Sequence, residues 1–224
     1  MIKAIITDIE GTTTSVSFVY DVLFPYARQE MTPFILTHFN DEIVQTQIKL
    51  VSQETGKSLD DEQAIAQLLA WMDEDKKITP LKTLQGLIWE SGYQQGHFKG
   101  HVYEDVPRNL RRWHEQDIAL YVYSSGSVQA QKLLFAHTAY DDLTGLFSGY
   151  FDTRIGNKRD VGSYARIVEH IGFPANEILF LSDIEQELEA AELAGIKTLL
   201  LLRSGNKQPG KFRQASSFDQ IEIS

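Results

Sequence analysis

Polar side chains of the types used in phosphoryl transfer follow three apolar runs of this chain. Asp8 follows the first run, Ser124 the second, and Asp183 a third one near the end of the chain. A carboxylate can attack phosphorus and form an acyl phosphate, and a hydroxyl beside backbone N–H groups at a helix N-terminus can bind phosphoryl oxygens. Ligands of open parallel sheets bind beyond the carboxyl ends of the strands, so we interpret these residues as one set.

Three further residues join this set. Glu10 lies two residues after Asp8, from where a second carboxylate can reach a leaving oxygen. Ser125 adds a hydroxyl next to Ser124, and Lys158 precedes a predicted helix, where a cation could bind phosphate and neutralise crowded carboxylates. Each residue alone is more often part of a solvated turn, a helix cap or a surface charge. Their joint occurrence at successive turns of one sheet favours the catalytic interpretation.

A metal ion fits the same pattern. Mg²⁺ takes a few hard carboxylate oxygens and keeps water, so Asp8 and Asp183 from adjacent strands would suffice to hold it. Acidic residues also favour the first turn of a helix, which is the ordinary explanation for a lone Asp183.

The elements that position these residues alternate between strand and helix. Val106, Leu110 and Trp113 recur at helical spacing, and Asp160 is an expected N-cap of another helix. Alternation of this kind predicts an α/β fold with a doubly wound parallel sheet, a Rossmann-like core. The predicted strands span residues 2–7, 118–123, 147–151, 178–181 and 196–202.

The stretch between the first two predicted strands is too long for one crossover and predicts an inserted helical cap. Apolar residues at helical spacing mark three helices there, with Asp60 and Thr79 near two of the helix starts. Small polar residues and glycines at 15–18 and 96–100 are the expected hinges. The predicted domains are residues 1–14 and 100–224 for the α/β catalytic core and residues 15–99 for the cap.

Composition limits the partners. The 21 basic and 31 acidic side chains give a net charge of −10, which repels phosphate polyanions such as nucleic acid. The absence of cysteine excludes disulfides, thiolate zinc sites and thiol nucleophiles. No leader-like segment opens the chain, and no apolar run approaches the roughly 18 residues that span a bilayer. The expected protein is a cytoplasmic monomer that acts on a small-molecule phosphate, without nucleic-acid or membrane partners.

The candidate residues resemble the four motifs of the haloacid dehalogenase superfamily of phosphohydrolases, over essentially the whole chain. By that resemblance Asp8 is the nucleophile, Ser124 binds the phosphoryl group, Lys158 holds nucleophile and phosphate together, and Asp183 completes the Mg²⁺ site. The insert is similar to the helical cap that follows the first motif in many members.

Glu10 departs from the commonest pattern, because most phosphatases of the superfamily carry Asp at that position. Four segments are instead similar to the enolase-phosphatase of methionine salvage: residues 8–13 (DIEGTT), 84–90 (LQGLIWE), 102–107 (VYEDVP) and 123–127 (YSSGS). This resemblance implies two Mg²⁺-dependent reactions on 5-methylthio-2,3-dioxopentyl phosphate. Enolisation comes first, and hydrolysis of the ester then yields the acireductone 1,2-dihydroxy-5-methylthiopent-1-en-3-one.

In that family, the residue at Glu10 contacts the metal through its backbone carbonyl, which leaves the side chain available for proton transfer. Glu10 is our hypothesis for the enolisation base. The methylthio tail needs an apolar wall, and Phe18, Trp89, Tyr93 and Phe98 are available near the expected hinges. Ordinary packing is the more common use of such aromatic residues.

Three other classes of protein share part of this residue pattern. A phospho-receiver domain carries its phosphorylated Asp after the third strand and has no large helical insert. A carbon–halogen hydrolase needs no metal, and Asp183 and the Ser-Ser-Gly turn at 124–126 argue against it. A single-function phosphatase of a small sugar or carboxylic-acid phosphate stays open, and release of phosphate from common sugar phosphates without action on the diketone would favour it.

Overall fold

The computed structural model describes residues 1–204 and 210–223. Residues 205–209 and 224, which belong to the predicted core range 100–224, lie outside the described residues. The chain divides into two compact units: Met1–Val16 with Lys99–Ser224 forms unit 1, and Ser17–Phe98 forms unit 2.

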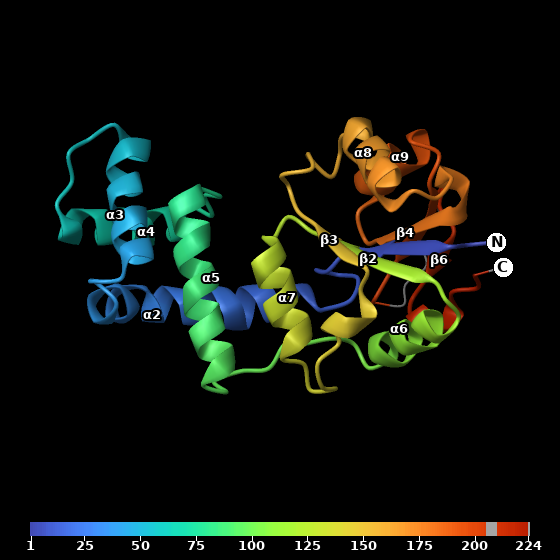
Figure 1. Ribbon diagram of the computed structural model, residues 1–224, viewed down its shortest axis with the longest axis horizontal. Helices are drawn as coiled ribbons and strands as arrows, with labels where there is room; N and C mark the ends of the chain where they lie inside the picture. The colour runs from blue at the N-terminus through green and yellow to red at the C-terminus, as the bar shows by residue number, and fades with distance from the viewer. Residues whose placement is uncertain (205–209, 224) are drawn as a thin grey trace. The chain divides into compact units, whose positions relative to one another are not determined.

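An all-parallel sheet is the centre of unit 1 (Figure 1). Six strands in the described residues follow the order β3-β2-β1-β4-β5-β6, which confirms the predicted doubly wound parallel sheet. A strand at 214–215 was not predicted, because two residues are too short to show a period. The strands are β1 (Ala4–Thr7), β2 (Ala119–Tyr123), β3 (Gly149–Phe151), β4 (Ile178–Ser182), β5 (Lys197–Leu201) and β6 (Gln214–Ala215).

β1 lies in the middle of the sheet and is buried along its whole length. Its last residue, Thr7, is in register with Val122 of β2 and Leu181 of β4. The chain leaves β1 toward one edge through β2 and returns beside β1 in β4, which makes the β1/β4 boundary the topological switch point. Asp8 and Asp183 follow these two strands directly, so the sheet order brings them to the place where such folds bind ligands.

Helices cover both faces of this sheet, with α8 and α9 on one side and α6 on the other (Figure 1). Tyr164 and Ile167 of α8 and Leu188 of α9 pack with Ile6 and Phe180 of the strands in one apolar core. The helices of unit 1 are α6 (Asp105–Glu115), α7 (Val128–Ala136), α8 (Val161–Ile171) and α9 (Glu185–Leu193), with short 3-10 turns η2 (Thr144–Leu146), η3 (Ala175–Glu177) and η4 (Phe218–Gln220).

Local capping explains where two of these helices begin. Asp160 accepts a hydrogen bond from the Gly162 N–H before α8, which confirms the predicted N-cap, and Ser127 accepts one from the Ala130 N–H before α7. Because α7 begins directly after the Ser124 turn, its N-terminal N–H groups lie beside that turn.

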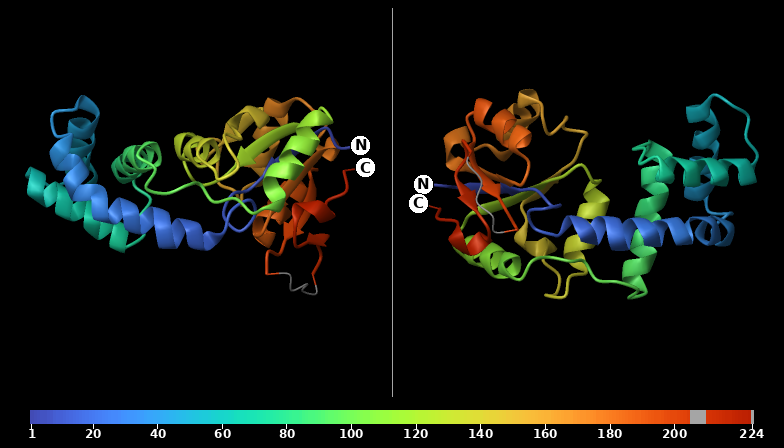
Figure 2. Two further views of the ribbon diagram at one scale, coloured as in Figure 1. Left: turned by 90° about the horizontal axis from the view of Figure 1, so that it is seen from below. Right: turned by 180° about the vertical axis from the view of Figure 1, so that it is seen from behind.

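Unit 2 is helical (Figure 2). It has its own apolar core. Met31, Val51, Leu68 and Leu84, one from each of its longer helices, are buried in that core. Asp60 forms a capping box with Gln63 at the start of α4. The helices are α1 (Val16–Phe18), the π-helix η1 (Val19–Leu23), α2 (Phe24–Thr37), α3 (Glu42–Thr55), α4 (Asp61–Asp73) and α5 (Thr79–Gln94).

The two boundaries between the units, after Val16 and after Phe98, fall within the ranges 15–18 and 96–100 that were expected as hinges. The chain at 15–18 is nevertheless helical from Val16 onward, and consecutive helical segments continue to Thr37. Ala27, Met31 and Ile35 recur at intervals of four residues, a spacing that is typical of a helix with one buried face. The strand expected at 147–151 begins only at Gly149, after the 3-10 turn.

No helix in the described part of the chain has the length and apolar character needed to cross a membrane.

Candidate active site

Asp8 lies immediately beyond β1 and is buried. Its backbone N–H donates to the Leu181 carbonyl at 2.9 Å, which extends the ladder to β4 by one residue. Its Oδ1 atom accepts a hydrogen bond from the Ile9 N–H at 2.8 Å. Both the backbone and the side chain of Asp8 are therefore held in place at the switch point.

A tight turn follows Asp8 and presents the next residues of the motif. The Ile9 carbonyl accepts hydrogen bonds from the N–H groups of Thr12, Thr13 and Thr14 at 3.1, 2.9 and 3.0 Å. Gly11 has a φ of +74° in this turn, and a Cβ atom there would lie 2.2 Å from Oδ2 of Asp183. Glycine is needed at this position for the backbone conformation and for the close approach to Asp183.

Lys158 lies between two carboxylates in the interior of the site. Its Nζ atom is 2.6 Å from Oδ1 of Asp8 and 2.7 Å from Oε2 of Glu187, and its side chain is 9% exposed. Burial alone would lower the pKa of Lys158, but the charges of Asp8 and Glu187 outweigh it and hold that pKa above its ordinary value. Lys158 is thus a permanent cation beside the predicted nucleophile.

Glu187 is the site residue that the sequence-based set omitted. It lies in the first turn of α9, four residues after Asp183, and its Oε2 atom accepts a hydrogen bond from Ser182 Oγ at 2.9 Å. Burial, followed by the charge of Asp8, raises the pKa of Glu187. The spacing of four residues after Asp183 was the available signal, because it places both carboxylates at one end of a helix.

Glu10 and Ser124 meet across the site. Ser124 is fully buried, and its Oγ atom donates to Oε2 of Glu10 at 3.3 Å. Burial raises the pKa of Glu10, and the nearby charge of Asp8 raises it further. A higher pKa makes a carboxylate a stronger base, which suits a group that accepts and then returns a proton. Ser125, the neighbouring predicted phosphate ligand, has an exposed side chain.

Asp183 completes the cluster from β4. Burial and then the charge of Asp8 raise the pKa of Asp183 to about 7. Its Oδ1 atom is buried without a hydrogen-bond partner among the described residues, a costly arrangement for a carboxylate. A cation between Asp8 and Asp183 would relieve both their repulsion and this missing contact.

The donor set fits a hard divalent cation that keeps most of its water. No group of three or more His, Cys, Asp or Glu side chains within residues 1–204 and 210–223 is arranged to hold a metal. Mg²⁺, however, is commonly held by one or two carboxylates, with water and substrate oxygens as its other ligands. The two carboxylates of Asp8 and Asp183 meet that requirement, and the orphaned Oδ1 of Asp183 supports it.

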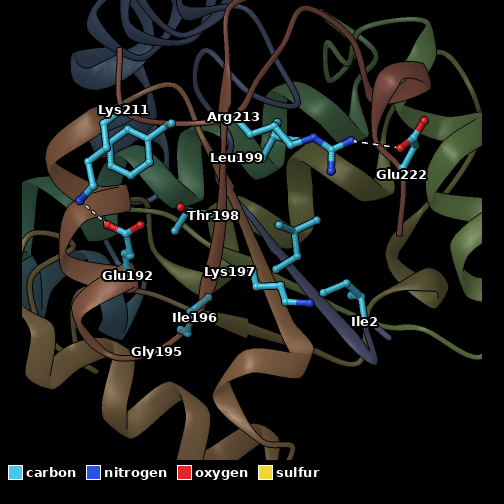
Figure 3. A pocket seen from close by; sticks show the side chains of 12 residues that line it. Ile2, Glu192, Gly195, Ile196, Lys197, Thr198, Leu199, Lys211, Arg213 and Glu222 are labelled. Carbon is cyan, nitrogen blue, oxygen red and sulfur yellow. Dashed lines mark ion pairs between the residues drawn. The ribbon is translucent and has the colours of Figure 1, made fainter. Parts of the chain in front are cut away.

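A separate cavity of about 480 Å³ lies at the opposite ends of the strands (Figure 3). It is lined by Ile2 before β1 and by Lys197 at the start of β5, among other residues. Arg213 pairs with Glu222 at 3.6 Å on its rim, and Lys211 pairs with a second glutamate, as Figure 3 shows. Because these are the amino ends of the strands, the cavity has no part in the chemistry at Asp8.

The aromatic residues expected near the methylthio tail pack inside unit 2. The Trp89 indole N–H donates to the Leu23 carbonyl at 2.8 Å. Phe98 contacts Tyr93 and Tyr26 edge-on, with ring centroids 4.5 and 4.9 Å apart. Phe18 is buried. Packing accounts for these contacts, and a role in substrate binding stays a prediction.

Comparison with known proteins shows the family of this chain. A family model described as haloacid dehalogenase-like hydrolase matches residues 2–195. The chain is 56% identical over 222 residues to the Enolase-phosphatase E1 of Methylococcus capsulatus, covering 99% of this chain and 98% of that protein. The chain belongs to the enolase-phosphatase E1 family of haloacid dehalogenase-like hydrolases. This confirms the family predicted from the motifs.

Further family resemblance extends over the whole chain. The Enolase-phosphatase E1 of Pseudomonas aeruginosa is 54% identical over 219 residues, which cover 97% of each chain. The crystal structure of the UTR4 protein of Saccharomyces cerevisiae has a TM-score of 0.85 at 36% identity, and the match covers 99% of this chain and 100% of that one. The similarity to these relatives therefore includes both units of the structure.

Proposed function

We propose that this enzyme converts 5-methylthio-2,3-dioxopentyl phosphate to the acireductone in two steps, enolisation followed by hydrolysis of the phosphate ester. The observation that carries the proposal is that two carboxylates with different partners follow β1: Glu10 accepts a hydrogen bond from Ser124 at 3.3 Å, and Asp8 pairs with the buried Lys158 at 2.6 Å. The relatives at 50–56% identity named Enolase-phosphatase E1 support the same two-step activity. Loss of a proton and transfer of a phosphoryl group then share one site.

Glu10 would carry the proton in both steps. In the enolisation, its carboxylate removes a proton from the carbon that bears the phosphate ester, and the electrons move to the neighbouring carbonyl oxygen. The raised pKa of Glu10 favours this transfer, and the Ser124 hydroxyl orients the accepting carboxylate. The enolate oxygen takes up a proton from solvent, which completes the enol. The protonated Glu10 can then deliver the proton it removed from carbon to the leaving oxygen when the ester bond breaks.

Asp8 would attack the phosphorus atom in the second step. Its Oδ1 atom is already bound to the Ile9 N–H and to Lys158, which leaves Oδ2 as the attacking atom. The bond from phosphorus to the substrate oxygen breaks as the aspartyl-phosphate forms, and water later hydrolyses that acyl phosphate. Ser124, Ser125 and Lys158 are the proposed ligands of the phosphoryl oxygens.

The proposed cofactor is Mg²⁺, held by the side chains of Asp8 and Asp183 and by the backbone carbonyl of Glu10. When bound, it supplies positive charge that stabilises the enolate oxygen and the phosphoryl oxygens. The two crowded carboxylates and the unpartnered Oδ1 of Asp183 support this assignment.

The remaining proposals concern the setting of the reaction. We propose that residues 1–14 and 100–224 form the catalytic core and that residues 15–99 act as a cap that shields the substrate from water. The enzyme would work as a cytoplasmic monomer in the salvage route of methionine biosynthesis. The absence of cysteine supports the cytoplasmic location, and the net charge of −10 argues against nucleic acid as a partner.

Spectroscopy of one reaction mixture tests the proposal. The diketone phosphate and Mg²⁺ are mixed with the enzyme, and the enol absorbance should rise and then fall as phosphate appears. Glu10→Gln should abolish the enol phase and retain Mg²⁺ binding, whereas Glu185→Gln, an exposed carboxylate on α9, should behave as the wild type. Phosphate release without an enol phase would leave only a phosphatase, and normal enolisation by E10Q would contradict the role of Glu10.

A further inference from the structure

Arg203 connects the end of the sheet at β5 to the turn that follows β1. It lies two residues beyond β5, and its side chain is only 10% exposed. Its Nε and Nη2 atoms both donate to the Thr12 carbonyl, at 2.8 and 2.6 Å. Thr12 directly follows Gly11 in the turn that carries Glu10, so a residue 191 positions away in the sequence anchors that turn.

The guanidinium group of Arg203 is itself fixed on its other sides. Its Nη1 atom donates to both oxygens of Asp105, at 3.0 and 2.7 Å, and Asp105 Oδ2 also accepts from the Phe218 N–H at 2.6 Å. The guanidinium carbon lies 4.2 Å from the ring centroid of Tyr103 and 5.0 Å from that of Phe218. A buried, bidentate and stacked arginine of this kind holds one geometry, which a lysine cannot reproduce.

The residues after Thr12 are held by the segment that contains Tyr103. The Tyr103 N–H donates to the Thr13 carbonyl at 3.0 Å, and Thr14 Oγ1 lies 2.8 Å from His101 Nδ1. Arg203 is therefore one of three consecutive attachments along the outer side of this turn. It is also the one that lies next to Gly11 and Glu10.

Asp8 has strong attachments of its own that do not involve the Arg203 site. Its N–H donates to the Leu181 carbonyl at 2.9 Å and its Oδ1 atom pairs with Lys158 at 2.6 Å, whereas its link to Thr13, a hydrogen bond from Thr13 Oγ1 to the Asp8 carbonyl, is longer at 3.3 Å. Loss of the Arg203 anchor should therefore displace Glu10 and leave Asp8 in place.

We propose that Arg203, oriented by Asp105, is a positioning residue that holds the Glu10 turn in the geometry needed for enolisation. The inference rests on the proposed function for the role of Glu10. The proposal also assigns a role to residues 102–107, none of which is a catalytic residue in the mechanism above. Tyr103 and Asp105 from that segment form two walls of the Arg203 site.

The chain offers a matched control for the test. Arg108 lies on α6 and pairs with Asp219 of η4, with Nε and Oδ1 at 2.9 Å, so it also ties α6 to the C-terminal segment. Arg108 is exposed, and within residues 1–204 and 210–223 its side-chain hydrogen bonds and ion pair go to Asp219 and not to the Glu10 turn. Arg108→Met therefore removes an ion pair between α6 and the C-terminal segment without touching the proposed anchor.

The experiment compares Arg203→Met, Arg203→Lys and Arg108→Met with the wild type in three measurements. Enol formation from the diketone phosphate reports on Glu10, and phosphate release from an activated aryl phosphate reports on Asp8 without an enol step. Hydrogen exchange at the amides of residues 12–14 reports on the turn directly. R203M should lose between about ten- and a hundredfold in enol formation with a smaller loss on the aryl phosphate.

R203K should form enol faster than R203M, because one donor and the charge beside Asp105 remain. R203K also provides the test if R203M does not fold. Exchange at residues 12–14 should accelerate in R203M and stay unchanged in R108M. Equal losses on both substrates, or unchanged exchange in R203M, would overturn the proposal. If the wild type forms no enol, the proposed function fails, and the exchange measurement alone then decides whether Arg203 anchors the turn.

Discussion

The Nζ atom of Lys158 lies 2.6 Å from Oδ1 of Asp8, in a pair that is almost fully buried. Glu187 contacts the same ammonium group at 2.7 Å. Two carboxylates thus share one cation, and one of the two is the proposed nucleophile. Glu187 has no role in the proposed chemistry, so its contact with Lys158 can be tested separately from that of Asp8.

Replacing Lys158 with Met should lower both activity and stability. The change leaves two buried carboxylates without their cation, and breaking a buried ion pair costs about 3–5 kcal/mol. The double variant K158M with Glu187→Gln removes one of those charges, so urea unfolding should show a partial recovery of stability, whereas phosphate release should not return. Lys197→Met, at an exposed lysine, is the control. Unchanged stability in K158M would contradict this account.

Gly11→Ala and Gly56→Ala should differ although both glycines have positive φ. Gly56 has a φ of +67° and open space around an added Cβ, so G56A should cost only the backbone strain, about 1 kcal/mol. In G11A the added Cβ would lie 2.2 Å from Asp183 Oδ2, and Asp183 must move. G11A should lose more stability in thermal unfolding and should bind Mg²⁺ more weakly. Equal effects of the two variants would show that the contact with Asp183 is tolerated.

Asp183→Asn should have opposite effects with and without metal. In metal-free protein the change removes a carboxylate that faces Asp8, so the variant should be at least as stable as the wild type. Excess Mg²⁺ should stabilise the wild type by about 2.7 kcal/mol at a free concentration of about 100 times its Kd, and D183N by much less. Thermal unfolding in chelator and in Mg²⁺ measures both effects. An equal Mg²⁺ stabilisation of both proteins would exclude Asp183 as a ligand.

His101 should make stability depend on pH. Its Nδ1 atom accepts from the Ser15 N–H at 3.1 Å, and burial, followed by the charge of Arg203, lowers the pKa of His101 below its ordinary value of 6.5. The unfolded chain then binds more protons, so this contribution to stability is present above pH 6.5 and is lost as the pH falls below it. His101→Asn keeps an acceptor near Nδ1 without titrating.

Urea unfolding of wild type and H101N at pH 8 and at acidic pH provides the measurement. The wild type should lose stability relative to H101N only at acidic pH. His114→Asn, at an exposed histidine of α6, should leave the pH dependence unchanged. The same pH dependence in wild type and H101N would exclude His101 as its source.

Local signals allowed much of the fold to be predicted. Asp60 and Asp160 predicted helix starts because an N-cap acts on backbone N–H groups within the next three residues. The apolar runs predicted five of the strands, since parallel strands are buried on both faces. The helix that begins at Val16 was missed because Ser15 and Ser17 suggested a hinge, although the spacing of the buried Ala27, Met31 and Ile35 predicts a helix.

The amino-acid sequence alone was sufficient to bring Asp8, Ser124, Lys158 and Asp183 together as one candidate set, because residue type and position after a strand are local properties. Tertiary structure decided the contacts among them. It paired Lys158 with Glu187 as well as Asp8, and it placed Arg203 on the Thr12 carbonyl. Such contacts join residues far apart in the chain, and they arise only when parallel strands bring their carboxyl ends to one edge of the sheet.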